Sequence, residues 1–219
     1  MTRAQIIWLV LLNISSFAIG LIAFPLLKEE SPIHWNMQGE VDGYAGRLEA
    51  AFLFPAMVLV TTAIFMALPL HPSLRASLAK SGKYYGRMII AGIIALVGIQ
   101  LAIMLQVFGK FDAPRYAMLV LGCFIMVVGN WMGKIRRNNI MGIRTPWTLA
   151  SDVVWERTHR IGGRLLVVVG LITSLSTILT DRPMVSLSVL YVGVTATVIW
   201  SIVYSWRLFH QLPPKPQAD

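Results

Sequence analysis

Long uncharged apolar blocks dominate this sequence, and they decide what kind of fold the chain can adopt. A helix needs roughly 20 apolar residues to cross about 30 Å of hydrocarbon. Of the 219 residues, 56% are hydrophobic and 13% are charged, against about 25% charged in a typical soluble domain. We therefore expect an all-α, polytopic integral membrane protein with six transmembrane helices. The six predicted spans are residues 4–27, 50–70, 88–109, 116–133, 165–180 and 184–206.

Lys and Arg are distributed unevenly among the loops, and this sets the predicted orientation. With the N-terminus in the cytoplasm, 14 of the 19 Lys and Arg lie inside and seven of the ten acidic residues lie outside, as the positive-inside rule requires. Six spans return the C-terminus to the cytoplasm, where Pro213, Pro214 and Pro216 indicate a non-helical tail. The net charge of +9 is then a basic cytoplasmic face, and we expect no direct nucleic-acid binding.

The middle of every predicted span lacks Asp, Glu, Lys, Arg and His. Ionisable residues inside a bilayer usually mark transport pathways or proton relays, so this pattern argues against a proton-coupled pump. The amides Asn13, Gln100 and Asn130 are expected to hydrogen-bond between helices. Gly129 and Gly133 form a small-xxx-small pair, which favours close approach of two helices.

A polar segment, residues 28–47, joins the first two spans and is expected outside the membrane. Its Asp42-Gly43 dipeptide predicts a turn. His34, Glu40 and Asp42 carry groups that suit a cation or ligand site, but we assign no metal ligand, since no spacing such as His-Glu-x-x-His occurs. A ligand- or peptide-facing surface and a purely structural loop are the other interpretations. The candidate ligand surface comprises Pro32, His34, Trp35, Asn36, Gly39 and Asp42.

The basic segment 134–164 joins the fourth and fifth spans and is expected in the cytoplasm. Pro146 biases Thr145 away from helical conformation, which indicates an extended or turned stretch. Arg144 and Trp147 are residue types that often anchor protein interfaces. This stretch is therefore a candidate contact surface.

A helix is predicted to begin with Ser151 as its N-cap and to continue into the fifth span. On this helix Glu156 and Arg160 stand at i,i+4 and can pair, whereas Trp155 and His159 share another face. His159 has no evident nucleophile or metal partner nearby in the sequence. We expect it to be packed and to donate a hydrogen bond to a backbone carbonyl, with no catalytic role.

Two adjacent glycines, Gly162 and Gly163, stand at the base of the fifth span. Each costs roughly 1 kcal/mol relative to Ala inside a helix, so the pair indicates either a close backbone approach or a bend that acts as a hinge. The predicted inner functional motif comprises Arg144, Thr145, Pro146, Trp147, Trp155, Thr158, His159, Gly162 and Gly163.

Both loops together carry a resemblance to the SdpI family, the immunity proteins of the sporulation-delaying-protein toxin system. The inner residues that carry it are Gly142-Ile-Arg-Thr-Pro-Trp-Thr-Leu149, Trp155 and Thr158-His-Arg-x-Gly-Gly163. The outer Pro32-Ile-His-Trp-Asn36 segment, with Gly39 and Asp42-Gly43, looks like the short domain of unknown function that often precedes this family. We divide the chain accordingly into residues 1–75, two spans with the outer loop, and residues 76–219, an SdpI-like region of four spans.

The resemblance implies a multi-pass protein of the bacterial plasma (inner) membrane that protects the cell from a secreted, membrane-active peptide toxin. In the best-known member it also implies signalling, in which the toxin-engaged protein holds a small repressor at the membrane. The expected partners are thus the peptide toxin on the extracytoplasmic side, a cytoplasmic repressor and the lipid bilayer.

Two other function classes compete with this interpretation. A transporter or channel for a small or amphipathic solute is the main alternative, because a facilitator needs no charge in the membrane. A membrane enzyme is disfavoured, because the candidate groups around His159 and His34 lie on opposite sides of the bilayer and the family implies no known reaction. We therefore expect neither catalytic residues nor a cofactor.

Overall fold

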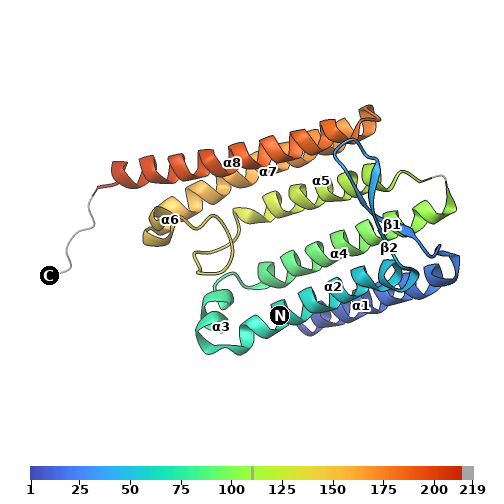
Figure 1. Cartoon of the computed structure of the whole chain (residues 1–219). Coiled ribbons are helices and arrows are strands. Elements are labelled where there is room, and N and C mark those ends of the chain that lie inside the picture. The colour runs from blue at the N-terminus through green and yellow to red at the C-terminus, as the bar shows by residue number, and fades with distance from the viewer. Residues whose placement is uncertain (110, 214–219) are drawn as a thin grey trace.

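Six long helices, joined by short elements, make up most of the chain (Figure 1). The computed structural model describes residues 1–109 and 111–213; Lys110 and the tail residues Pro214 and Pro216, used in the predictions above, lie outside them. Each long helix has the length and composition to cross a membrane, so the predicted fold class and six spans are confirmed. The long helices are α1 (Arg3–Ala23), α2 (Arg47–Ala67), α4 (Lys83–Leu105), α5 (Ala113–Met132), α7 (Asp152–Leu179) and α8 (Pro183–Gln211). The short elements are β1 (Ser31–Trp35), β2 (Val41–Ala45), α3 (Pro72–Ala79), α6 (Pro146–Ala150) and three 3-10 turns at Phe24–Leu26, Leu68–Leu70 and Gln106–Phe108.

The two ends of the bundle carry different elements. Figure 1 shows the N-terminus, α3, α6 and the end of α8 at one end, and the β1–β2 hairpin at the other. The basic segments that the charge pattern placed on one side therefore do share one end of the molecule. We name this end the inner end and the hairpin end the outer end. Which end faces the cytoplasm stays a prediction, as does the division at residue 75.

Helices α5 and α7 pack with their backbones close together, and glycines line the contact. A Cβ added at Gly129 would lie 2.5 Å from the carbonyl oxygen of Gly163, and one at Gly170 would lie 2.5 Å from that of Gly122. A Cβ at Gly133 would lie 3.3 Å from the Cα of Arg160. The predicted small-xxx-small approach is therefore confirmed, and van der Waals packing of this kind is a main source of helix association in lipid.

Helices α1, α2 and α4 are joined by buried and half-buried polar side chains instead. Ser16 on α1 donates to the side-chain carbonyl of Gln100 on α4, whose amide donates back to the Ser16 carbonyl oxygen at 2.9 Å. The Asn13 amide donates to Thr62 Oγ1 on α2 at 3.0 Å. These two predicted interhelical amides are confirmed. Asn130 is exposed and makes no side-chain hydrogen bond in the described part of the chain, so the prediction is wrong for that residue.

The outer segment forms an antiparallel hairpin of β1 and β2 that the sequence did not predict. Its turn depends on Asn36, whose side-chain oxygen accepts from the backbone N–H groups of Gln38 and Glu40 at 3.0 and 2.9 Å. Gly39 completes the turn with φ +85°, a conformation that favours glycine. Asp42-Gly43 lies within β2, so the turn predicted there is wrong: the Asn36 side chain satisfies the backbone at an earlier position.

Candidate functional site

The inner motif is organised around a stacked pair, Trp155 and His159, one turn apart on α7. The two rings lie 3.9 Å apart between centroids, and both side chains are buried. The indole N–H of Trp155 donates to the Ile135 carbonyl oxygen at 2.7 Å. The pair thus holds the segment that follows α5 against the first turns of α7.

His159 uses both ring nitrogens in the fold. Nδ1 donates to the Trp155 carbonyl oxygen at 2.8 Å, and Nε2 accepts from the backbone N–H of Ile143 at 2.9 Å. Because a backbone N–H can only donate, Nε2 carries no proton and the imidazole is neutral. The predicted packed histidine that donates to a backbone carbonyl is confirmed.

Gly142 is required where the loop crosses this pair. Its φ is +108°, which a residue with a side chain rarely adopts. A Cβ there would also overlap Nε2 of His159 and lie 3.2 Å from the Trp155 ring. The glycine that opens the Gly-Ile-Arg-Thr-Pro-Trp motif therefore lets the backbone reach the histidine.

Thr145 and Thr148 fold the next residues into the short helix α6. Thr145 Oγ1 accepts from the Thr148 N–H at 3.1 Å, and the Thr145 N–H donates to Thr148 Oγ1 at 2.9 Å, which is a reciprocal capping box. Pro146 occupies the first helical turn, where its missing N–H has no cost. Thr145 Oγ1 also lies 3.0 Å from Oγ of Ser205 on α8. The motif is thereby tied to α8 as well as to α7.

The two adjacent glycines of α7 serve two different contacts. A Cβ at Gly162 would lie 2.9 Å from Ile143 Cδ1 and 3.2 Å from Ser201 Oγ, whereas Gly163 faces the backbone of α5 at Gly129. Helix α7 is continuous from Asp152 to Leu179, and Ser151 caps it as predicted. The glycines therefore give the close approach that was one of the two expectations; their use as a hinge stays a prediction.

The remaining motif residues divide into buried and exposed side chains. Thr158 is fully buried, and within the described residues its hydroxyl oxygen has no hydrogen-bond partner. Arg144 and Pro146 are exposed, and Trp147 is half-buried beside them. Arg144 donates to the carbonyl oxygens of Asn139 and Ile140, the second at 3.3 Å, so its own loop orients the guanidinium.

Sequence reasoning missed Asn138, which shapes the loop before the motif. Its side-chain oxygen accepts from the N–H groups of Ile140 and Met141 at 2.8 and 2.7 Å, and its amide donates to the Arg136 carbonyl oxygen at 2.8 Å. The amide also reaches Ser81 Oγ, just after α3, at 3.3 Å. Two successive asparagines after a basic run were the available signal, since Asn side chains often form such turns.

The inner end has a basic surface groove of about 700 Å³ beside these residues. Arg137 pairs with Asp152 at 2.8 Å, and Arg160 pairs with Glu156 as predicted. The cations Lys80, Lys134 and Arg136 also line the groove, and no ion pair to them occurs among the described residues. The inner end thus presents net positive charge.

The outer candidate residues lie on the hairpin, mostly at its surface. His34 Nδ1 on β1 lies 2.6 Å from Asp42 Oδ1 on β2, and both side chains are exposed. Glu40 instead accepts a hydrogen bond from the Asn36 amide at 3.1 Å. The three groups proposed for a cation therefore do not converge, and the described residues contain no cluster of three His, Cys, Asp or Glu suited to a metal.

The hairpin tip rests on the first turn of α8. A Cβ at Gly39 would lie 2.9 Å from Cγ of Pro183. Figure 1 shows the hairpin crossing the outer end from α1 and α2 toward α7 and α8. Pro32, Trp35 and Asn36 are partly buried at the base and turn of this hairpin.

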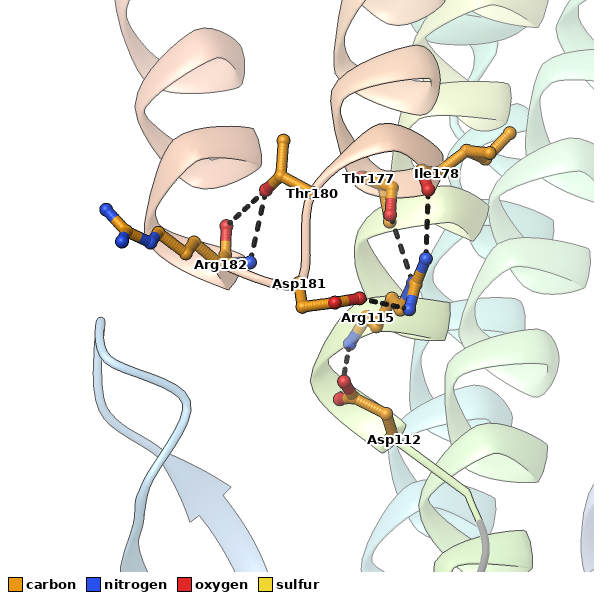
Figure 2. Close-up of polar contacts among 7 residues, drawn as sticks. All are labelled: Asp112, Arg115, Thr177, Ile178, Thr180, Asp181 and Arg182. Atoms are coloured by element: carbon orange, nitrogen blue, oxygen red, sulfur yellow. Dashed lines mark hydrogen bonds and ion pairs between the residues drawn. The ribbon is translucent and has the colours of Figure 1, made fainter.

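Arg115 fixes the α7–α8 connection, just before the turn of α8 that the hairpin contacts (Figure 2). Its guanidinium donates to the carbonyl oxygens of Thr177 and Ile178 at 3.1 and 2.9 Å and to Asp181 at 2.7 Å. A cation at the carbonyl end of a helix is electrostatically favourable. Asp112 caps α5 by accepting from the Arg115 N–H at 3.1 Å. The start of α8 is thus held in a defined place.

Both loops lie in regions that match models of described families. The model of the SdpI/YfhL protein family matches residues 134–205, and the model of a domain of unknown function, DUF1648, matches residues 11–59. Immunity protein SdpI of Bacillus subtilis (strain 168) is 25% identical over 201 residues, which cover 90% of this chain and 92% of that relative. No solved structure matches the chain significantly.

These matches agree with the resemblance inferred from the loop motifs. The SdpI match begins just after α5 and includes the motif, α7 and most of α8, whereas the DUF1648 match includes the hairpin. The chain is therefore a multi-pass membrane protein in which a region that matches DUF1648, residues 11–59, precedes a region that matches the SdpI/YfhL family, residues 134–205.

Proposed function

We propose that this chain is an immunity protein of the bacterial plasma membrane, which protects the cell from a secreted, membrane-active peptide. The observation that carries the proposal is the relative named immunity protein, which aligns along 90% of the chain and so includes both loops. The six spans support the same function, because a protein embedded in a bilayer can meet a peptide that attacks bilayers.

The outer hairpin is the proposed contact surface for the peptide. It presents exposed polar groups at His34 and Asp42 beside exposed apolar side chains: Tyr44 is 61% exposed and Met37 51% exposed. A surface that mixes these groups at the bilayer boundary suits an amphipathic peptide, whose polar and apolar faces both need partners.

Helix α8 provides a direct route from the hairpin to the inner motif. Its first residue, Pro183, lies against Gly39, and Ser205 near its other end contacts Thr145. A peptide that binds one position of the hairpin better than another would shift α8 and, with it, the exposed Arg144 and the half-buried Trp147. We infer that these inner residues form the docking surface for a cytoplasmic repressor.

The proposed function needs no catalytic step. Both nitrogens of His159 are occupied by backbone groups, so neither is available as a base or nucleophile. His34 and Asp42 lie at the outer end, while Asp152 and Glu156 are engaged by Arg137 and Arg160.

The experiment is expression in a toxin-sensitive bacterium that is challenged with a panel of membrane-active peptides. Cells with the wild-type chain should survive at least one peptide that kills control cells, and His34→Ala/Asp42→Ala should lose much of this protection. Glu49→Gln on the first turn of α2 is the matched outer control and should protect normally. If no peptide is resisted, while purified protein in proteoliposomes conducts a solute, the transporter alternative replaces this proposal.

A further inference from the structure

A groove between α4 and α5 opens on the surface of the bundle and is separate from both loops. It has a volume of about 540 Å³ and is lined only by residues of these two helices, within the range of roughly 300–1,000 Å³ common for ligand sites. Its walls are apolar and include Ala91, Gly98, Val120 and Cys123. Cys123 is exposed there, so the groove is open to whatever surrounds the helices.

The groove has the length of one leaflet. It runs along α4 from Arg87 to Gly98, which is about 16 Å at 1.5 Å per residue. The hydrocarbon core is about 30 Å thick, so the groove reaches from the inner end to about the bilayer centre. This is the span of a single acyl chain from the inner leaflet.

At the inner end of this groove, its mouth, the lining residue Arg87 belongs to a cluster of three cations around one aromatic ring, that of Tyr84. The side-chain charges of Lys83, Arg87 and Lys134 lie 5.8, 5.5 and 6.0 Å from the ring centre of Tyr84. Arg87 also lines the groove, as does Trp131 on α5. Tyr and Trp at this level are typical of the membrane interface.

These cations have no acidic partner in the described part of the chain. The ion pairs there involve His34, Arg47, Arg115, Arg137 and Arg160. Like charges that gather around one ring repel each other, and an anion between them would relieve the repulsion. The mouth therefore has the charge of a phosphate site, and the groove beneath it has the shape and polarity of an acyl-chain site.

We propose that the α4–α5 groove binds an anionic phospholipid, with its phosphate held by Lys83, Arg87 and Lys134 and one acyl chain lying along the groove. The apolar walls alone would accept any lipid. The three cations select the anionic headgroup, because a zwitterionic headgroup brings a compensating positive charge.

Native mass spectrometry of the full chain in neutral detergent tests this directly. Phosphatidylglycerol and phosphatidylcholine with identical acyl chains are titrated in turn, and the first lipid adduct is quantified. The wild type should prefer phosphatidylglycerol. Arg87→Gln/Lys134→Gln should lower the affinity for phosphatidylglycerol by about fivefold for each charge removed and leave the affinity for phosphatidylcholine unchanged. Arg164→Gln/Arg207→Gln removes the same charge from exposed positions on α7 and α8 and should change neither.

A second variant separates the groove from surface charge in general. Ala91→Phe fills the groove and should weaken the first adduct of both lipids. Cys123, the only cysteine, reports occupancy independently: phosphatidylglycerol should slow its alkylation by N-ethylmaleimide in the wild type and not in Arg87→Gln/Lys134→Gln.

Four results would overturn the proposal. Equal affinity for the two lipids would show that no headgroup site exists. An equal loss of phosphatidylglycerol affinity in Arg164→Gln/Arg207→Gln would show that diffuse surface charge causes the preference. Displacement of phosphatidylglycerol by free glycerol phosphate at similar concentration, or unchanged binding in Ala91→Phe, would show that no acyl chain occupies the groove.

Discussion

The inner motif and the outer hairpin both stand out in the sequence, yet the fold uses their side chains in opposite ways. At the inner end Trp155, Thr158 and His159 are buried, and Trp155 and His159 donate to or accept from backbone groups. At the outer end His34 and Asp42 are exposed and contact each other across two strands. Most inner motif residues therefore build a scaffold, and the exposed Arg144 and the half-buried Trp147 are what this scaffold presents.

The largest expected effect is at the glycine on which the inner scaffold closes. Gly142→Ser introduces a side chain at φ +108° against His159, and we expect it to lower the free energy of unfolding by about 3 kcal/mol. Thermal unfolding in detergent measures this. Gly46→Ser is the matched outer substitution: its Cβ meets nothing within 4 Å, and Ser is a good N-cap for α2. Similar melting temperatures for the two variants would contradict the contrast between the ends.

The exposed part of the motif should affect function without affecting folding. Arg144→Ala and Trp147→Ala should each abolish immunity while membrane levels and melting temperature stay near those of the wild type, because the Arg144 side chain is exposed and that of Trp147 is only half-buried. Survival assays combined with immunoblots of membrane fractions check this. Full protection by both variants would show that the inner motif is not a functional surface.

The two histidines give a matched test of buried against exposed polar groups. His159→Phe leaves the Ile143 N–H without its acceptor, which should cost about 1–3 kcal/mol. His34→Phe, at an exposed site, should stay within about 0.5 kcal/mol of the wild type. Chemical denaturation of both variants measures the difference, and an equal effect would mean that burial at His159 does not matter.

The smallest effect is expected at the contact between the motif and α8. Thr145→Val removes the α6 cap and the contact to Ser205 and should cost about 1 kcal/mol. The substitution should impair repressor recruitment more than this small loss of stability explains, because it interrupts the proposed route along α8. Thr180→Val, which removes the contacts of Thr180 with Arg182 at the outer end, is the control. Normal repressor recruitment in Thr145→Val cells would argue against this route.

The parts of the fold that follow from local sequence were predictable. The six spans follow from the length of the apolar blocks, and the cap of α7 follows from the residue type of Ser151. The close approach of α5 and α7 follows from the small residues Gly129 and Gly163. The pairing of Glu156 with Arg160 follows from helical periodicity.

The parts that depend on distant contacts were not predictable. The hydrogen bond from Ile143 to His159 joins a loop to a helix, and Arg115 reaches α7 from α5. The hairpin turn was misplaced because the Asn36 side chain, rather than the Asp42-Gly43 dipeptide, satisfies the backbone. The roles of the candidate site residues stay predictions, since geometry distinguishes scaffold from exposed surface and leaves the partner to experiment.

The most direct test of the proposed immunity is the membrane potential of sensitive cells, followed with a voltage-sensitive dye while a membrane-active peptide is added. Cells that carry the wild-type chain should hold their potential against at least one peptide that depolarises control cells, and cells with Arg144→Ala/Trp147→Ala should depolarise like the control. Equal depolarisation of wild-type and control cells by every peptide would contradict the account.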